Sequence, residues 1–385
     1  MKSMPRSARD VYQQARPFAL TLLLGVAALT IALAGVRSIR DIVGPVFLAL
    51  VLTITLHPVR IWLERHGLPE WAASIVMLLA AYLLLFLLTL ALIVSVAQLA
   101  NLIPQYADQI KDGVENAGNT LRDLGVKQDQ IDAVVGAIDP GQVVDLAMSL
   151  LSGTLGVVGN LFFLFTVLLF MAFDTDSTRR SLAVVGERFP DPVAALAGFA
   201  RGARGYMGVS AGFGLVVAVI DGVVLQVMGV PGAFVWAVLA FVTNFIPNIG
   251  FVIGVIPPAL IALLDSGPEL MIAVIVAYTV INFVIQSVIQ PRVVGDTVGL
   301  TAMLTFLSLV FWTWVVGPLG ALLAVPLTLL TKALLIEADP RTRWALPLVT
   351  GTPEAARTSV PNTAAGDDGP KPEATPEPLH EEPQG

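Results

Sequence analysis

The sequence contains no cysteine and only three histidines among its 385 residues. Without cysteine, the chain has no disulfide, no thiolate ligand for zinc or an iron–sulfur cluster, and no cysteine nucleophile. Charged residues are also scarce, at 13% of the chain, whereas 56% is hydrophobic. This balance is typical of polytopic membrane proteins and leaves no basic surface for nucleic acid. Because neither a GxxxxGK[ST] nucleotide loop nor an HExxH zinc motif occurs, we expect no enzyme activity, cofactor or metal.

The apolar residues are gathered into about eight hydrophobic segments, which predict an all-α polytopic membrane protein with the lipid bilayer as its surroundings. A bilayer core of roughly 30 Å requires about 20 apolar helical residues. Six segments suit a single crossing: Phe18–Val36, Ile42–Leu63, Trp71–Ala97, Leu150–Phe173, Met207–Val230 and Leu270–Ile289. The remaining two, Phe234–Leu264 and Ala302–Ile336, are longer and interrupted by glycine and proline.

Charge between these segments predicts their orientation. Basic residues precede the first segment and fill the stretch 174–206, which places both on the cytoplasmic side by the positive-inside rule, whereas the acidic stretch 98–149 suits the outside. The predicted organisation is a cytoplasmic segment (1–17), three spans (18–97), an external segment of short amphipathic helices (98–149), a fourth span (150–173), a basic cytoplasmic loop (174–206), a transport core (207–336) and a disordered, acidic, proline-rich cytoplasmic tail (350–385).

The first interrupted segment, Phe234–Leu264, is too long for one crossing and too short for two. Its centre carries Asn244, Pro247, Asn248 and Gly250, so we expect two half-helices around a polar break. Broken backbone at membrane depth is tolerated only where protein or a water-filled cavity satisfies it, which makes the break a candidate binding site. The alternative is two ordinary short spans joined by a turn at the far surface.

The second interrupted segment is broken at Gly317–Gly320, where Pro318 and Gly320 lie. Each interruption follows a complete span. Residues 207–336 are therefore predicted to form two units, each with one span followed by one broken hairpin. Paired interruptions at corresponding positions are typical of transporters built from inverted repeats. Two topologies remain open: six crossings with two re-entrant hairpins, or eight crossings.

Polar residues within the hydrophobic segments are the candidates for a solute or ion pathway. Asp221 is a carboxylate inside the fifth span, where it could bind a proton or a sodium ion, unless it lies near the surface and is simply hydrated. Asn282, Gln286 and Gln290 follow at i, i+4 and i+8, on one helical face. Their amides, with those of Asn244 and Asn248, suit a neutral polar solute or serve as hydrogen bonds between helices.

Three runs of sequence resemble the autoinducer-2 exporter family of bacterial permeases: FVTNFIPNIGFVIGVIPPALIALL, INFVIQSVIQPRVVGDTVGL and GPLGALLAVPLTLL. The resemblance implies a multi-spanning protein of the bacterial inner membrane that exports the quorum-sensing signal autoinducer-2 and assembles from several copies. Some relatives are described as sodium or lithium/proton antiporters. The chain departs from the family pattern at Asn248, and Asp221 is no family hallmark. Positions that match the pattern are Pro247, Gly250, Gln290, Pro291, Gly295, Gly320 and Pro326.

Three hypotheses about function follow. The leading hypothesis is a secondary transporter that exports a small polar metabolite such as autoinducer-2 past the broken segments and the amide residues. The second is a monovalent cation/proton antiporter that uses Asp221. The third is a membrane organiser without transport activity, which would act through its external segment and its tail.

Overall fold

The computed structural model describes residues 18–102, 140–247, 249–290 and 299–351, and within these ranges all regular structure is helical. The predicted all-α class is therefore confirmed. The N-terminal segment, most of the predicted external segment and nearly all of the predicted tail lie outside the described residues. The first seven helices are α2 (Phe18–Ser38), α3 (Arg40–Arg65), α4 (Glu70–Leu102), α7 (Pro140–Arg188), α8 (Pro190–Val227), α9 (Ala233–Thr243) and α10 (Gly250–Ser266). They are followed by α11 (Pro268–Asn282), the π-helix η2 (Phe283–Ile289), α13 (Ala302–Val316), α14 (Pro318–Leu322), α15 (Ala324–Lys332), the π-helix η3 (Ala333–Glu337), the short η4 (Arg343–Ala345) and α16 (Leu346–Thr350).

Helices long and apolar enough to cross a bilayer confirm a polytopic membrane protein. Four such helices occur in the described part of the chain: Arg40–Arg65, Glu70–Ser95, Pro190–Val227 and Pro268–Ile289. A fifth arises if the two parts of α7, which meet at 54° near Thr175, count as one span. Four shorter apolar helices accompany them, Leu22–Ser38, Ala233–Thr243, Gly250–Ser266 and Ala302–Val316.

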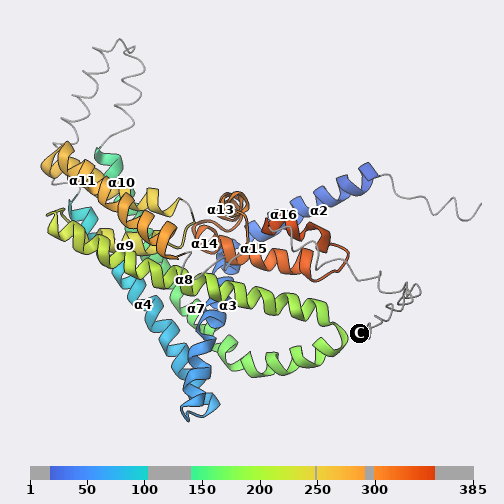
Figure 1. Ribbon diagram of the computed structural model, residues 1–385. Coiled ribbons are helices and arrows are strands. Elements are labelled where there is room, and N and C mark those ends of the chain that lie inside the picture. Colours follow the sequence, from blue (N-terminus) through green and yellow to red (C-terminus); the bar gives the residue numbers. More distant parts are fainter. Residues whose placement is uncertain (1–17, 103–139, 248, 291–298, 352–385) are drawn as a thin grey trace, which may run out of the picture.

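The predicted loop 174–206 is helical over almost its whole length. Residues up to Arg188 continue α7, and α8 begins at Pro190. The helix that contains the predicted fifth span, Met207–Val230, therefore starts 17 residues before the apolar segment does. Pro190 favours a helix start because amide protons in the first turn have no partner within the helix, so proline, which lacks this proton, loses no hydrogen bond there. These two helices form the sharp corner at the right-hand side of Figure 1.

The helix α8 runs the length of the molecule, and two helical hairpins pack along it (Figure 1). Hairpin 1 consists of α9 and α10, and hairpin 2 consists of α13 with the returning helices α14 and α15. Hairpin 1 lies along the second half of α8, where Gly222 faces Ala237 of α9. Hairpin 2 lies along the first half, where Gly202 faces Leu329 of α15. The small glycines allow this close packing.

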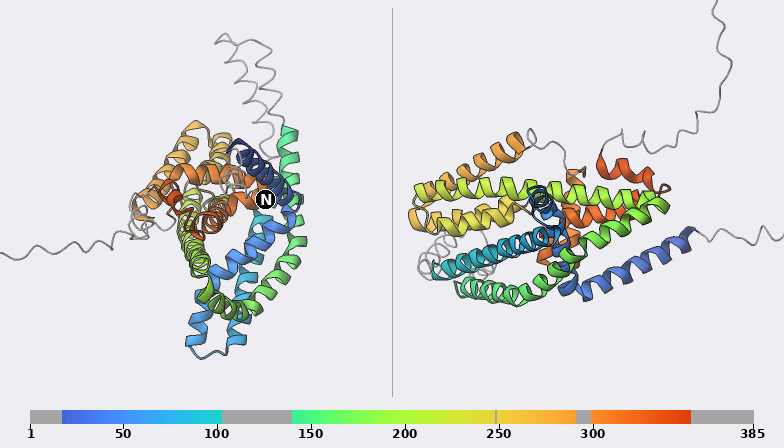
Figure 2. Two further views of the ribbon diagram at one scale, coloured as in Figure 1. Left: turned by 90° about the vertical axis from the view of Figure 1, so that its right-hand side faces the viewer. Right: turned by 90° about the horizontal axis from the view of Figure 1, so that it is seen from below.

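The order of contacts along α8 shows that the two hairpins point in opposite directions. Near the start of α8, Gly198 faces Glu337, and one turn further along Gly202 faces Leu329. Residues closer to the turn of hairpin 2 therefore contact α8 farther from its start, so this turn lies near the middle of α8. From the other end, Gly222 faces a residue of the α9 helix, and Gly214 faces Asn244, which lies in the turn of hairpin 1. Both turns therefore meet near the middle of α8, the long light-green helix that runs across the right-hand view of Figure 2.

Each hairpin turns back at a glycine that has no room for a side chain. A Cβ on Gly250 would overlap the carbonyl oxygen of Thr243, and a Cβ on Gly320 would overlap the carbonyl oxygen of Trp312. Gly317, which ends α13, has a φ of 84°, a conformation that side chains other than glycine rarely adopt. The two interruptions predicted from the sequence are therefore turns of the same kind, with the backbones of the two arms in close contact.

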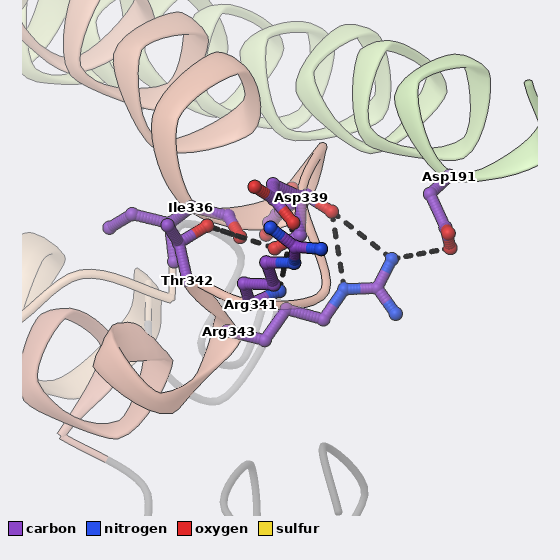
Figure 3. A network of polar contacts seen from close by, with 7 residues as sticks. Asp191, Ile336, Asp339, Arg341, Thr342 and Arg343 are labelled. Carbon is purple, nitrogen blue, oxygen red and sulfur yellow. Dashed lines mark hydrogen bonds and ion pairs between the residues drawn. The ribbon is translucent and has the colours of Figure 1, made fainter. Parts of the chain in front are cut away.

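The end of the described chain fastens hairpin 2 to the start of α8 (Figure 3). The Arg343 guanidinium forms an ion pair with Asp191 at 2.5 Å and donates hydrogen bonds from Nε and Nη2 to the carbonyl oxygen of Glu337, at 3.2 and 3.1 Å. The hydroxyl of Thr342 donates to the carbonyl oxygen of Ile336. Charge-assisted bonds of this kind satisfy carbonyl groups that the end of a helix leaves without partners.

Candidate functional site

The polar residues of the hydrophobic segments converge on one small cavity between α8, hairpin 1 and α11. Its volume is about 10 Å³, the size of one water molecule. Four of the candidates from the sequence line it, one from α8, one from the turn of hairpin 1, one from α11 and one from η2. The lining residues are Val217, Asp221, Ala240, Thr243, Asn244, Phe251, Gly254, Tyr278, Asn282 and Gln286.

Asp221 and Tyr278 are the most deeply buried polar residues that line this cavity. Asp221 is 1% exposed, and among the residues that the structure describes neither carboxylate oxygen has a hydrogen-bond partner. Tyr278 is likewise 1% exposed, and its hydroxyl also lacks a partner within that part of the chain. This burial keeps the Asp221 side chain away from the surface of the described part of the chain. A carboxylate at such a site is stabilised when it binds a proton, a cation or a water molecule.

A chain of amide hydrogen bonds connects three of the residues that line the cavity. The Gln286 Nε2 donates to Asn244 Oδ1 at 3.1 Å and to Asn282 Oδ1 at 2.9 Å. Asn244 Nδ2 donates in turn to the carbonyl oxygen of Ser210 on α8, at 3.0 Å. Gln286 therefore links α11 to the turn of hairpin 1, and Asn244 links that turn to α8.

The helix that carries Gln286 is locally irregular. Residues Phe283–Ile289 form a π-helix that continues directly from α11. Such wide turns are uncommon within helices and frequently occur at functional sites, because they shift side chains away from their regular α-helical positions. Gln286 is also exposed, so its amide can be reached from outside the cavity.

The turn of hairpin 1 has a polar side and an apolar side. Asn244 faces the cavity, whereas the next residue, Phe245, belongs to a buried apolar cluster that also contains Val316 and Leu323 of hairpin 2. The hydroxyl of Tyr206 on α8 donates to the carbonyl oxygen of Phe245 at 2.9 Å. The turns of the two hairpins therefore share one core, and the backbone of the first turn is fixed to α8.

The remaining candidates lie outside the cavity. Pro247 and Gly250 shape the turn of hairpin 1, and Pro318 and Gly320 shape the turn of hairpin 2. Gln290 does not line the cavity, because eight helical residues after Asn282 carry it about 12 Å along the helix axis. A final candidate, Asn248, lies outside the described residues.

Two polar residues of the site were missed in the sequence. Tyr278 lies four residues before Asn282, on the face that Asn282 and Gln286 share, and this spacing could have revealed it. Thr243 is buried at the end of α9, and its hydroxyl donates to the carbonyl oxygen of Ala240 at 3.3 Å. Nothing in its spacing distinguishes it from other threonines, which commonly bond to the preceding turn.

The site offers oxygen atoms and amides but no cluster for a transition metal. Within the described ranges, no group of three or more His, Cys, Asp or Glu side chains is placed to hold a metal ion. Its carboxylate, hydroxyl and amide oxygens are suited to a proton, a water molecule or a small hard cation. Its amides are also suited to hydroxyl and carbonyl groups of a neutral solute.

Comparisons with known proteins agree with the resemblance noted in the sequence. A family model described as "AI-2E family transporter" matches residues 20–338. The chain is 32% identical over 326 residues to a putative transport protein of Haemophilus influenzae, covering 83% of this chain and 93% of the relative. It is 29% identical over 313 residues to "AI-2 transport protein TqsA" of Escherichia coli, covering 81% of this chain and 91% of the relative.

The similarity also extends to a mycobacterial protein, "Putative transport protein MT0215" of Mycobacterium tuberculosis, which is 28% identical over 337 residues. The match covers 83% of this chain and 89% of that relative. The family model spans both hairpins, so the site described above lies within the matched residues. The chain therefore belongs to the AI-2E transporter family, whose members are membrane transport proteins and not enzymes.

Proposed function

We propose that this protein is a secondary transporter that exports a small polar solute past the turn of hairpin 1. One observation supports this proposal above the others: Asp221, Asn244, Asn282 and Gln286 come from three separate segments and line one cavity at a broken hairpin. Polar side chains at membrane depth are costly, and at a helix break they are typical of transport sites. Autoinducer-2, the solute in the printed name of the relative TqsA, is the first solute to test.

In this proposal the cavity is the closed state of the pathway. About 10 Å³ admits a water-sized group but not a metabolite, so passage requires the turn of hairpin 1 to separate from α11. The Gln286–Asn244 hydrogen bond is the polar contact that joins these two parts. Solute hydroxyl groups can replace this bond, because each amide then keeps a partner. Binding of the solute would thereby favour the open state.

The proposed membrane arrangement follows from the opposite directions of the two hairpins. We infer that hairpin 1 enters the bilayer from outside and hairpin 2 from the cytoplasm, since α9 is only 11 residues long and cannot cross alone. The bacterial inner membrane, cytoplasmic termini and assembly of several copies complete this proposal. The segments assigned to a membrane organiser without transport activity lie largely outside the described residues.

Flux through the purified protein in liposomes tests the proposal. The solutes are autoinducer-2 and neutral polyols of similar size, measured with imposed proton and sodium gradients and against protein-free liposomes. Gradient-dependent efflux of autoinducer-2 or of a polyol is the expected result. Absence of protein-dependent flux for every solute, from protein that remains folded, would refute export of small polar solutes.

A second candidate function, monovalent cation/proton antiport, is favoured by the buried carboxylate of Asp221, which has no hydrogen-bond partner among the residues that the structure describes. Substitution Asp221→Asn keeps the shape of the side chain but removes its exchangeable charge. Sodium-driven proton movement, followed with a pH dye inside the liposomes, should then be lost, while exposed Asp265→Asn should retain it. Full activity of the Asp221→Asn variant would remove this candidate.

A further inference from the structure

The last described part of the chain, residues 338–350, presents two large apolar side chains to the outside and is here named the terminal segment. Trp344 and Leu348 are 71% and 73% exposed, whereas the other residues of 342–350 are partly buried. A spacing of four residues brings side chains to the same side of a helix, so η4 and α16 hold these two on one face. Their exposure shows that no part of the described chain covers this face.

Hydrogen bonds and one ion pair fasten the terminal segment to the base of hairpin 2. The Arg343 guanidinium pairs with Asp191 at the start of α8 and donates to the carbonyl oxygen of Glu337, where η3 ends. The backbone amide of Thr301, which caps the start of α13, donates to the carbonyl oxygen of Val349 at 3.1 Å. The terminal segment is therefore connected to both arms of hairpin 2 and to α8.

Two lengths of helix indicate how far the terminal segment lies from the turns of the hairpins. On α8, Asp191 precedes Tyr206, which holds the turn of hairpin 1, by 15 residues, or about 22 Å at 1.5 Å per residue. In hairpin 2, Glu337 follows Leu323, which lies in the core shared by the two turns, by 14 residues, or about 21 Å. Half of a bilayer with its headgroups measures about 20–22 Å. With both turns at the bilayer centre, the terminal segment lies at the level of the headgroups.

We propose that Trp344 and Leu348 insert into the lipid surface of the cytoplasmic leaflet, so that the terminal segment anchors the base of hairpin 2 there. Tryptophan is enriched at this level because its ring is apolar while its N–H finds polar partners, and Leu348 adds apolar area that the lipid buries. Arg341, which is exposed three residues before Trp344, lies within reach of anionic headgroups. The inference rests on the proposed re-entrant arrangement of the hairpins and not on the identity of the solute.

The chain contains no cysteine, so a fluorophore can be attached at one chosen position of the full-length protein. The Leu348→Cys variant is labelled with a polarity-sensitive dye and reconstituted into liposomes of phosphatidylethanolamine and phosphatidylglycerol that contain nitroxide-labelled lipids. The matched control is Asp339→Cys, an exposed polar position of the same segment. We expect the label at position 348 to emit at a shorter wavelength and to be quenched several-fold more strongly than the label at position 339.

Both positions are exposed, so the labels leave the packing of the protein intact. Equally weak quenching at positions 348 and 339 would overturn the proposal. A short-wavelength emission that is lost on deletion of residues 352–385 would show that this part of the chain covers the face, and one that is lost on dilution of the protein in lipid would show that a second copy does. Either result would also overturn it. The label reports position and not transport, so the outcome is independent of the flux assay.

Discussion

Substitution of Gly250 by alanine should disrupt the turn of hairpin 1. The added Cβ would overlap the carbonyl oxygen of Thr243, which belongs to the backbone of α9 and cannot rotate away as a side chain can. The two arms of the hairpin must therefore move apart. This movement would reach Asn244, whose amide contributes to the cavity.

The expected loss of stability lies toward the upper end of the usual range for overpacking, about 1–3 kcal/mol. The gain in helix propensity offsets little of it, because Gly250 is the first residue of α10. Gly212→Ala is the matched control: this glycine lies inside α8, and nothing lies within 4 Å of the position of an added Cβ. Alanine there should be neutral or stabilising by up to about 1 kcal/mol.

Thermal unfolding of the detergent-purified proteins measures this difference, with liposome flux as the functional readout. Gly250→Ala should unfold at a lower temperature than the parent and transport more slowly, while Gly212→Ala should match or exceed the parent's midpoint. An unfolding midpoint for Gly250→Ala as high as that of Gly212→Ala would refute the close approach of the two arms.

Three further substitutions test how the hairpins are held. Gly320→Ala should destabilise hairpin 2 by an amount similar to that of Gly250→Ala, since its Cβ would also meet a backbone carbonyl; the thermal midpoint measures this. Tyr206→Phe removes one hydrogen bond to Phe245 and should cost about 0.6 kcal/mol, which the unfolding midpoint again reports, and a larger loss would show a role beyond that bond. Arg343→Gln should lower the free energy of unfolding by about 1 kcal/mol, because it removes the ion pair that joins hairpin 2 to α8. In a double-mutant cycle, the charge-swapped protein with Asp191→Arg and Arg343→Asp should recover part of this stability. No recovery would contradict a direct ion pair.

The sequence predicted the two interrupted hairpins because proline and glycine leave a clear signal in long apolar runs. Pro247 and Gly250 mark one turn, and Pro318 and Gly320 mark the other. It also indicated that the amides share a site, since Asn282 and Gln286 are spaced by one helical turn. These features depend on local backbone preferences, which neighbouring residues determine.

Other features depend on contacts between distant segments, which the sequence does not display. The meeting of Asp221 with Tyr278 requires α8 to pack against α11, which no local pattern of residues indicates. The π-helix at Phe283–Ile289 has no clear sequence pattern either. The regular spacing that links Asn282, Gln286 and Gln290 did not indicate how far the cavity extends along the helix, and Gln290 lies outside it.

Efflux of autoinducer-2 from liposomes that contain the Asn244→Ala/Gln286→Ala double variant tests most directly whether the turn of hairpin 1 forms the transport site. The control is Gln290→Ala, which removes an amide of the same type from outside the cavity. Efflux should fall at least tenfold in the double variant and remain near the parent rate in Gln290→Ala. An unchanged rate in a folded double variant would contradict the assignment of the site.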